Sequence, residues 1–248
     1  KSSFVKRFTI FIKNMLRGFD EKWTAAFPID YNDELYMAVP RNTPISLISK
    51  YLDNIDIVKE DTYYPIKKIE SLKCDAKPRN DLQIKVLDFL VGRNEYSNVA
   101  NKPRKALYVD TGEGKTFLTL KYICGFRYFS CIFIPDDRGI KVWIEEILKF
   151  TNIKEDEIGI VKGATSLPKI ISNKDKYKIV LFSNKTFSSL VDSGNWQKLV
   201  DFFDEMQFTL KVNDEIHLHL KTVFYTDALV TTYKTLYLTA TDRVKDYN

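Results

Sequence analysis

The sequence predicts an α/β fold in which a parallel central sheet is covered by helices on both faces. From about residue 79 onward, short apolar segments alternate with segments whose apolar residues recur at helical spacing. The apolar segments contain few polar residues, as in strands that are buried on both faces. A third observation is a glycine-containing loop that joins one such strand to the following helix. Strands alternating with helices are typical of parallel sheets.

The expected elements follow one another in a regular order. Leu82, Val86 and Leu90 recur at helical spacing and predict a helix over residues 79–91. A further helix is expected after the glycine-containing loop, ending near Ile123. An amphipathic helix is expected over residues 140–150, and strands over residues 106–109, 129–134, 179–182, 208–212 and 235–238.

Residues 1–76 show a different pattern and predict a small α+β accessory domain that precedes a domain of residues 77–248. No residue in this region indicates a chemistry, so a structural or partner-contacting role is expected. The pattern predicts a helix over residues 4–19, strand candidates at 35–39, 55–58 and 63–69, and a helix start at Thr43-Pro44.

Composition excludes several classes of protein. Of the 248 residues, 44% are hydrophobic and 29% are charged, which fits a soluble globular protein and not a disordered one. No apolar run approaches the roughly 20 residues that span a bilayer. Cys74, Cys124 and Cys131 lack metal-ligand spacing, and His217 and His219 are the only histidines, so a zinc site is not expected. Reduced thiols fit the cytoplasm of a bacterium or of a virus-infected cell.

The positive charge is concentrated in one segment. Residues 77–105 contain seven Lys and Arg against three acids, which supplies +4 of the net charge of +5. Such a patch is compatible with phosphate contacts. An ordinary solvated face explains it equally well, so charge does not establish a nucleic-acid partner.

The sharpest motif is the phosphate-loop candidate over residues 109–116, which follows a predicted strand and opens a predicted helix. Gly112 and Gly114 allow a tight turn in which successive backbone amides point at phosphate oxygens. Lys115 would reach the β- and γ-phosphates of a nucleotide, and the Thr116 hydroxyl would ligate Mg²⁺. Val109 stands where the usual motif begins with glycine, but the strand–loop–helix context favours nucleotide binding over an incidental turn.

A second motif ends another apolar strand with the adjacent carboxylates Asp214 and Glu215. Because the carboxyl ends of parallel strands share one edge, these acids are expected to face the phosphate loop. Asp214 can hold the Mg²⁺ shell, and Glu215 can orient or deprotonate the attacking water. Such a pair is common on protein surfaces, so it indicates a catalytic site only in combination with the phosphate loop.

These motifs resemble those of superfamily 2 helicases of the DExH type. Residues 214–217 resemble the DExH box, and residues 111–116 resemble motif I. Residues 239–241 resemble motif III, and Gln83 stands where these proteins place a glutamine that reads adenine. The resemblance covers residues 79–242 and implies a RecA-like P-loop NTPase domain that uses ATP and Mg²⁺. Within that superfamily, the sequence most resembles phage helicases of the UvsW type.

The resemblance assigns roles to residues at the matching positions. It implies that His217 links the γ-phosphate state to Thr239 and Thr241, although a buried, hydrogen-bonded histidine and an ordinary strand end are the alternatives. For His219, outside the motif, the buried histidine is the preferred interpretation. The implied catalytic residues are Lys115, Asp214, Glu215 and His217, the metal ligands are Thr116 and Asp214, and the nucleotide-binding residues are Gln83, Thr111, Gly112, Glu113, Gly114, Lys115 and Thr116.

Nucleic-acid contacts are expected in the loops after the remaining strands, each against the alternative of a solvated loop. Asp136 and Asp137 would repel a phosphate backbone, which leaves Arg138 and free backbone amides as contacts at that loop. The other implied contact residues are Gly163, Ser183, Asn184 and Lys185.

The chain ends at Asn248, just after the motif III resemblance. Related motors need a second RecA-like domain with an arginine that stabilises the transition state. We therefore expect a fragment that binds ATP but turns it over poorly. DNA is favoured over RNA as its partner. The alternatives are an RNA helicase, a motor subunit of a restriction or viral transcription complex, and a catalytically silent interaction module.

Overall fold

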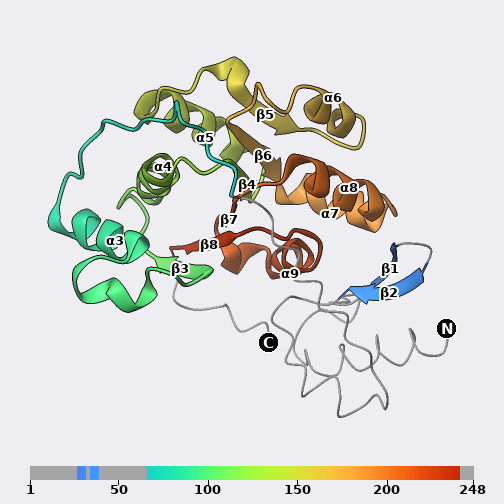
Figure 1. The fold of residues 1–248 in the computed structure, drawn as a ribbon, viewed down its shortest axis with the longest axis horizontal. Helices are drawn as coiled ribbons and strands as arrows, with labels where there is room; N and C mark the ends of the chain where they lie inside the picture. Colours follow the sequence, from blue (N-terminus) through green and yellow to red (C-terminus); the bar gives the residue numbers. More distant parts are fainter. Residues whose placement is uncertain (1–26, 32–33, 39–65, 241–248) are drawn as a thin grey trace, which may run out of the picture.

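The central feature is a six-stranded parallel sheet (Figure 1). The computed structural model describes residues 27–31, 34–38 and 66–240. Across the sheet the strand order is β3-β8-β7-β4-β6-β5, and every pairing is parallel. The strands are β3 (Arg104–Tyr108), β4 (Ser130–Ile134), β5 (Ile158–Val161), β6 (Ile179–Ser183), β7 (Leu210–Asn213) and β8 (Lys234–Thr239).

Helices cover both faces of the sheet, which gives three layers (Figure 1). On one face lie α3 (Asp81–Val91), α4 (Lys115–Phe126) and α5 (Asp137–Phe150). On the other face lie α6 (Ser166–Ser172), α7 (Asn184–Asp192), α8 (Trp196–Met206) and α9 (Leu220–Leu229). Short 3-10 helices are η1 (Asn94–Val99), η2 (Glu155–Glu157) and η3 (Ile216–Leu218). Among the described residues, none of the helices combines the length and apolar composition that a membrane crossing requires.

The predicted α/β class and its parallel sheet are confirmed. Strand β5 was not predicted from the sequence, because Ile158–Val161 includes a glycine and is only four residues long. The strand candidate over residues 63–69 is wrong for its described part. There, only an isolated antiparallel bridge from Lys68 to Tyr128 forms.

The parallel arrangement positions the candidate site, because all six strands end at one edge. The phosphate-loop candidate follows β3, and the acidic pair follows β7. A single strand, β8, separates them and ends at Thr239. The loops proposed to contact nucleic acid follow β4, β6 and β5, which form the other half of the sheet. The two groups of candidates therefore occupy neighbouring halves of the same edge.

The described segment from Ile66 to Ala76 packs against the sheet domain, although the sequence analysis assigned it to the N-terminal domain. Leu72 is buried in the main core. Thr209 and Lys67 exchange two hydrogen bonds, at 2.8 and 2.9 Å. Lys121, on α4, donates to the carbonyls of Cys74 and Ala76 at 2.6 and 2.8 Å. We therefore propose that residues 66–76 belong to the sheet domain.

Two further strands, β1 (Phe27–Tyr31) and β2 (Glu34–Ala38), form an antiparallel pair. The expected strand at residues 35–39 corresponds to β2. The expected helix over residues 4–19, the helix start at Thr43-Pro44 and the strand candidate at 55–58 lie outside the described residues, as does Thr241.

Lys105 corrects the charge interpretation of the sequence. Its side chain is buried, and its ammonium donates to the carbonyls of Leu90 at 2.5 Å and Phe89 at 3.4 Å. These carbonyls belong to the last turn of α3, where a cation is favourable because the helix dipole is negative there. Burial lowers the pKa of Lys105. This lysine stabilises the fold and is not part of a surface patch.

Candidate nucleotide-binding site

The loop after β3 has the backbone of a phosphate-binding turn. Gly112 and Gly114 both have φ of +86°, a left-handed conformation that other residues adopt only with strain. Gly114 is the residue before the first turn of α4, so the partial positive charge of that helix faces the loop. Val109, where the motif usually has glycine, directly follows β3, and its amide donates to the Thr239 carbonyl at 3.1 Å. The unusual residue therefore lies before the turn and leaves the turn intact.

Gln83 supports this loop from α3. Its side-chain amide donates to the Glu113 carbonyl at 2.9 Å and accepts from the Arg79 amide at 2.9 Å. The side chain is only 3% exposed. Arg79 adds a hydrogen bond to the Gly112 carbonyl and an ion pair with Glu113 at 3.3 Å. The predicted adenine-reading residue thus holds the loop, and sequence reasoning missed Arg79 as its companion.

Lys115 and Glu215 join the two motifs across the edge of the sheet. Lys115 Nζ lies 2.7 Å from Glu215 Oε1. Glu215 has φ of +47° and ψ of 54°, a left-handed conformation that is costly for a residue with a side chain. Its second carboxylate oxygen accepts from the Ala240 amide at 3.2 Å. Both oxygens of this candidate base are therefore fixed, one by the first residue of α4 and the other by the residue after β8.

His217 extends this network to β8. Its Nδ1 lies 2.9 Å from Thr239 Oγ1 and 3.4 Å from Glu215 Oε2. The structure thus brings together His217 and Thr239, which the resemblance paired as coupling residues. The arrangement connects the end of β7 with the end of β8 beside Glu215.

Asp214 occupies a more enclosed position than Glu215. Its Oδ2 accepts a hydrogen bond from the indole Nε1 of Trp143, on α5, at 2.9 Å. Burial raises the pKa of the Asp214 carboxyl to about 6; the Trp143 hydrogen bond opposes this rise. The nearby charge of Glu215 raises the pKa further, and that of Lys115 lowers it. No sequence signal identified Trp143, because it lies 71 residues away and meets Asp214 only through tertiary packing.

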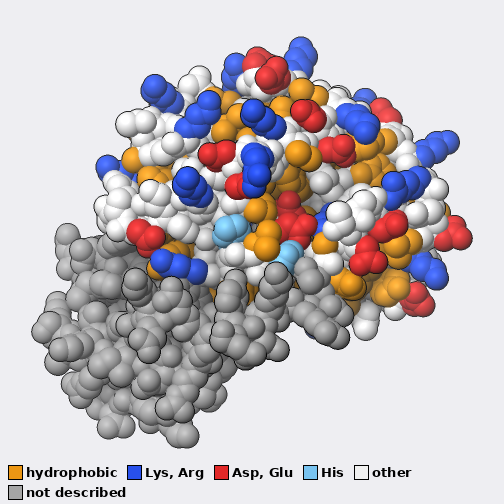
Figure 2. Space-filling view, turned by 180° about the vertical axis from the view of Figure 1, so that it is seen from behind, with side chains coloured by type: hydrophobic (Ala, Val, Ile, Leu, Met, Phe, Trp, Pro, Cys, Tyr) orange, Lys and Arg blue, Asp and Glu red, His pale blue; other side chains and the backbone are white. Residues whose placement is uncertain are grey.

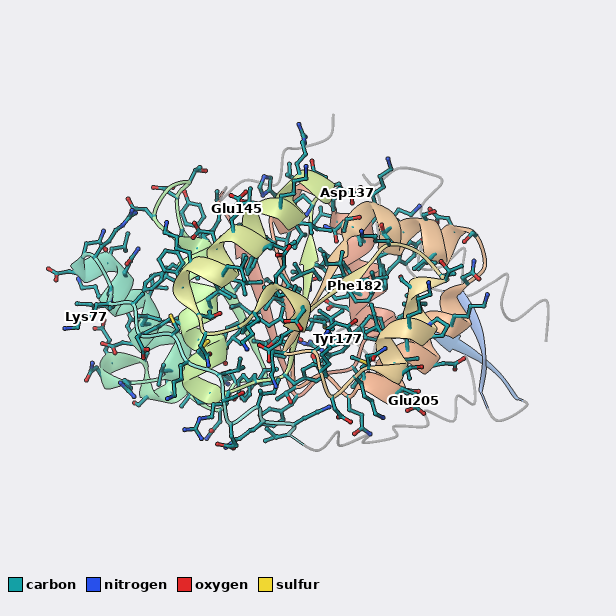
Figure 3. All side chains as sticks on the ribbon, turned by 90° about the horizontal axis from the view of Figure 1, so that it is seen from above. Lys77, Asp137, Glu145, Tyr177, Phe182 and Glu205 are labelled. Carbon is teal, nitrogen blue, oxygen red and sulfur yellow. The ribbon has the colours of Figure 1, made fainter. Side chains whose placement is uncertain are left out.

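A pocket of about 520 Å³ lies over the phosphate-loop candidate. Its size falls within the range of small-molecule sites. From the predicted set it is lined by Gln83, Thr111, Gly112, Gly114, Lys115, Thr116 and Glu215. The remaining lining residues were not predicted from the sequence; they are Lys77, Arg79, Phe117, Val142, Glu146, Lys149 and Phe150. In Figure 3, Lys77 is labelled near the start of α3, and the labels Asp137 and Glu145 both lie on α5.

The side chains of the site suit a metal that arrives with a nucleotide. Among the described residues, no group of three or more Cys, His, Asp or Glu could hold a metal ion alone. Mg²⁺ in nucleotide sites is usually held by one or two protein oxygens together with the phosphates. The hydroxyl of Thr116 lines the pocket, and Asp214 is close enough to Lys115 for that charge to lower its pKa. These two residues fit Mg²⁺ bound together with phosphate.

Comparison with known protein families identifies the domain. The profile described as "Type III restriction enzyme, res subunit" matches residues 44–243, which is most of the chain. The chain belongs to this family. The match confirms the superfamily 2 helicase-type domain inferred from the motifs. No match was found among curated proteins.

Solved structures similar to this member of the Type III restriction enzyme family are distant in sequence. A nuclease-deletion mutant of the Type ISP restriction-modification enzyme LlaGI, in complex with a DNA substrate mimic, shares 18% identity with a TM-score of 0.46. The Hef helicase domain of Pyrococcus furiosus shares 15% (TM-score 0.47), and the UvsW helicase from bacteriophage T4 shares 14% (0.42). The matches cover 66%, 67% and 67% of this chain but only 18%, 34% and 53% of those chains, respectively.

A groove of about 800 Å³ lies in the other half of the sheet edge of this Type III family member. It contains two of the residues proposed to contact nucleic acid, Asn184 and Lys185. Figure 2 shows histidine side chains on one face, with hydrophobic and acidic side chains between them. The groove is lined by Pro135, Asp136, Asn184, Lys185, Ser188, Ser189, Asp192, Ser193 and His219.

The structure corrects two expectations for nucleic-acid contacts. Ser183 is fully buried, and its hydroxyl accepts from the Thr186 amide at 3.1 Å as the cap of α7. Its hydroxyl is therefore not accessible to a nucleic-acid strand in this conformation. Asp136 caps α5 by accepting from the amides of Arg138 and Gly139 at 3.0 and 2.9 Å. The amides expected to be free are thus occupied, because the acid satisfies the helix N-terminus.

The remaining candidates differ in accessibility. The Arg138 side chain is 93% exposed and pairs with Asp136 at 2.8 Å. Gly163, with φ of +144°, forms a turn whose carbonyl accepts from Ser166. His219, preferred as a buried and hydrogen-bonded residue, is instead half-buried and lines the groove. Burial lowers the pKa of His219, and the Asp136 charge opposes this effect.

Proposed function

We propose that this chain is the ATP-binding part of an ATP-dependent DNA helicase or translocase. The observation that carries the proposal is the 2.7 Å pair between Lys115 and Glu215, formed beside a turn with φ of +86° at Gly112 and Gly114. Such a turn, a lysine and a carboxylate at one sheet edge are the parts that phosphoryl transfer requires. The Type III restriction enzyme family of the chain supports a motor that acts on DNA.

In this proposal the amides at the start of α4 and the Lys115 ammonium bind the phosphates. Phosphate oxygens would replace Glu215 as the partner of Lys115, because a multiply charged phosphate attracts an ammonium more strongly. Glu215 would then be free to orient water and accept its proton. Thr116 and Asp214 would hold Mg²⁺, which would neutralise the negative charge that develops on the phosphate.

His217 and Thr239 would transmit the state of this site. The 2.9 Å contact links η3, which follows the candidate base, to the end of β8. Lys185 in the groove and the exposed Arg138, which pairs with Asp136, would contact the phosphate backbone of nucleic acid from the other half of the edge. We propose that a second RecA-like domain supplies the transition-state arginine, so this chain alone should hydrolyse ATP slowly.

The test is ATP hydrolysis by the chain with single-stranded DNA, duplex DNA or RNA, combined with a DNA-versus-RNA competition for binding. We expect detectable Mg-ATP binding, slow turnover and little stimulation by any nucleic acid, with DNA bound more tightly than RNA. Tighter binding of RNA would favour the RNA-helicase alternative. Robust unwinding by this chain would contradict the need for a second domain.

A further inference from the structure

The two adjacent carboxylates of the site are held by partners of different chemistry. Glu215 is paired with the cation Lys115 at 2.7 Å. Asp214 accepts from the neutral indole of Trp143 at 2.9 Å. A nucleotide would attract Lys115 away from Glu215, whereas it offers nothing that competes for an indole N–H. The contact with Trp143 can therefore persist when the site is filled.

Trp143 is itself held firmly in place. Its side chain is 2% exposed, and it shares the sheet-facing side of α5 with Ile140 and Ile147, one turn away on each side. Asp136 caps the start of that helix with two hydrogen bonds. Tryptophan has only two side-chain torsions, so little entropy is lost in fixing the position of its N–H.

An indole suits a carboxylate that must remain able to bind a cation. Its N–H is a donor with no acceptor capacity and no charge. A lysine or arginine at the same place would neutralise Asp214 and repel Mg²⁺. The indole directs Oδ2 without neutralising the charge, and the Glu215 backbone also hydrogen-bonds to this carboxylate. The Asp214 carboxylate is thus oriented by neutral donors.

We infer that Trp143 is a positioning residue that orients Asp214 for Mg²⁺ when the nucleotide is bound. The inference rests on the proposed function, because it assumes that Asp214 is a metal ligand. Groups that orient metal ligands commonly affect metal affinity by roughly 10- to 100-fold. Trp143 acts through Asp214 and is not itself in contact with the reacting atoms.

The first experiment replaces Trp143 with Phe, which keeps an aromatic ring and removes the N–H. The Mg²⁺ concentration that half-saturates binding of a non-hydrolysable ATP analogue should rise roughly 10- to 100-fold. Binding of the same analogue in EDTA should stay within about twofold of wild type, since the phosphate loop is unchanged. Trp196→Phe, which removes an indole from the start of α8, is the matched control and should leave the Mg²⁺ requirement unchanged.

A second experiment needs no change at Trp143. The chain has three tryptophans, so the double variant Trp23→Phe, Trp196→Phe leaves Trp143 as the single fluorophore. Its emission should change when Mg²⁺ is added to the analogue-bound chain, because the metal withdraws electrons from the carboxylate that accepts the N–H. Adding Asp214→Asn to this variant should abolish the response.

The outcomes separate the inference from the proposed function. If the wild-type chain binds no Mg²⁺-nucleotide, both are overturned. If it binds and Trp143→Phe has the wild-type Mg²⁺ requirement, the positioning role is wrong while the proposed function stands. Equal loss of binding with Mg²⁺ and in EDTA would assign Trp143 a structural role only. The inference would also be overturned if the emission of the analogue-bound single-tryptophan variant did not change when Mg²⁺ is added.

Discussion

Lys115 and Glu215 are 100 residues apart in the sequence and form a 2.7 Å ion pair between the start of α4 and the turn after β7. Each partner has a proposed task that the pair prevents. The ammonium is the candidate phosphate ligand, and the carboxylate is the candidate base. Under the proposed function, nucleotide binding would therefore open this pair.

Glu215→Gln should separate binding from hydrolysis. The amide cannot form an ion pair with Lys115, so the ammonium is more available to phosphate. We expect nucleotide affinity to rise about 3- to 10-fold, since the lost pair is worth on the order of 1 kcal/mol. Hydrolysis should fall at least about 100-fold, because the base is lost. Titration with a fluorescent nucleotide and a phosphate-release assay measure the two effects; weaker binding would contradict the competition.

Gly114→Ala should impair the loop more than Gly112→Ala. Both positions have φ of +86°, so each substitution carries a backbone cost of about 1–2 kcal/mol. At Gly114 a Cβ would also lie 2.8 Å from Gln83 Nε2, whereas at Gly112 nothing lies within 4 Å. Nucleotide titration and thermal unfolding should rank the two variants in that order.

Gly125→Ala is the control for these glycine variants. This residue lies inside α4, and a Cβ there meets nothing within 4 Å. Alanine should stabilise the helix by about 0.5–1 kcal/mol without changing nucleotide affinity. Equal losses at positions 112 and 114 would show that the contact with Gln83 does not matter.

Asp214→Asn should change how stability depends on pH in the absence of nucleotide. Burial raises the pKa of Asp214 from 3.8 to about 6, so the folded state keeps this proton to higher pH than the unfolded state. The free energy of unfolding should therefore fall as the pH rises from about 4 to 6, by up to about 3 kcal/mol. Asn removes this contribution. Urea unfolding at pH 4.5 and 7.5 should show a smaller decline for the variant; parallel declines would contradict the buried carboxyl.

Lys211→Met should strongly destabilise the fold. The Lys211 side chain is 2% exposed and pairs with Asp227 at 2.6 Å, and Tyr237 donates to the same carboxylate at 2.7 Å. Removing the cation leaves a largely buried carboxylate without its charge partner, at a cost of about 3 kcal/mol or more.

Neutralising the carboxylate as well, with Asp227→Asn, should recover at least half of this loss in a double-mutant cycle. Lys176→Ala, which breaks an exposed 3.2 Å pair with Asp156, is the control and should cost under about 1 kcal/mol. If the two single lysine variants are equally stable, the buried pair does not have the role assigned to it.

The sequence was sufficient to predict the sheet and the two motifs at its edge. The alternation of short apolar segments with helical segments predicted the strands that became β3, β4, β6, β7 and β8, although lysines interrupt the apolar residues of β3 and β7. Parallel topology then predicted that Lys115 and the acidic pair would meet. The contacts that complete the site come from tertiary packing between distant elements. Trp143 on Asp214 and Ala240 on Glu215 have no local sequence signature.

Local chemistry also explains why some side chains were misjudged. Ser183 and Asp136 have residue types suited both to phosphate contacts and to helix capping, and only the structure shows that they cap α7 and α5. Lys105 has the charge of a surface residue, but the end of α3 lies within its reach. Gln83 donates its Nε2 to the loop carbonyl of Glu113 and accepts from the Arg79 amide with its Oε1, contacts that the resemblance to an adenine reader did not predict.

The most direct test of the central proposal is calorimetric titration of the chain with ATP, with and without Mg²⁺, beside the variants Lys115→Ala and Lys141→Ala. Lys141 is an exposed lysine on α5 and controls for the loss of one positive charge. We predict Mg²⁺-dependent binding by wild type and Lys141→Ala, and a loss of at least about 10-fold for Lys115→Ala. Equal binding by all three proteins, or no binding by wild type, would contradict the assignment of this edge of the sheet as a nucleotide site.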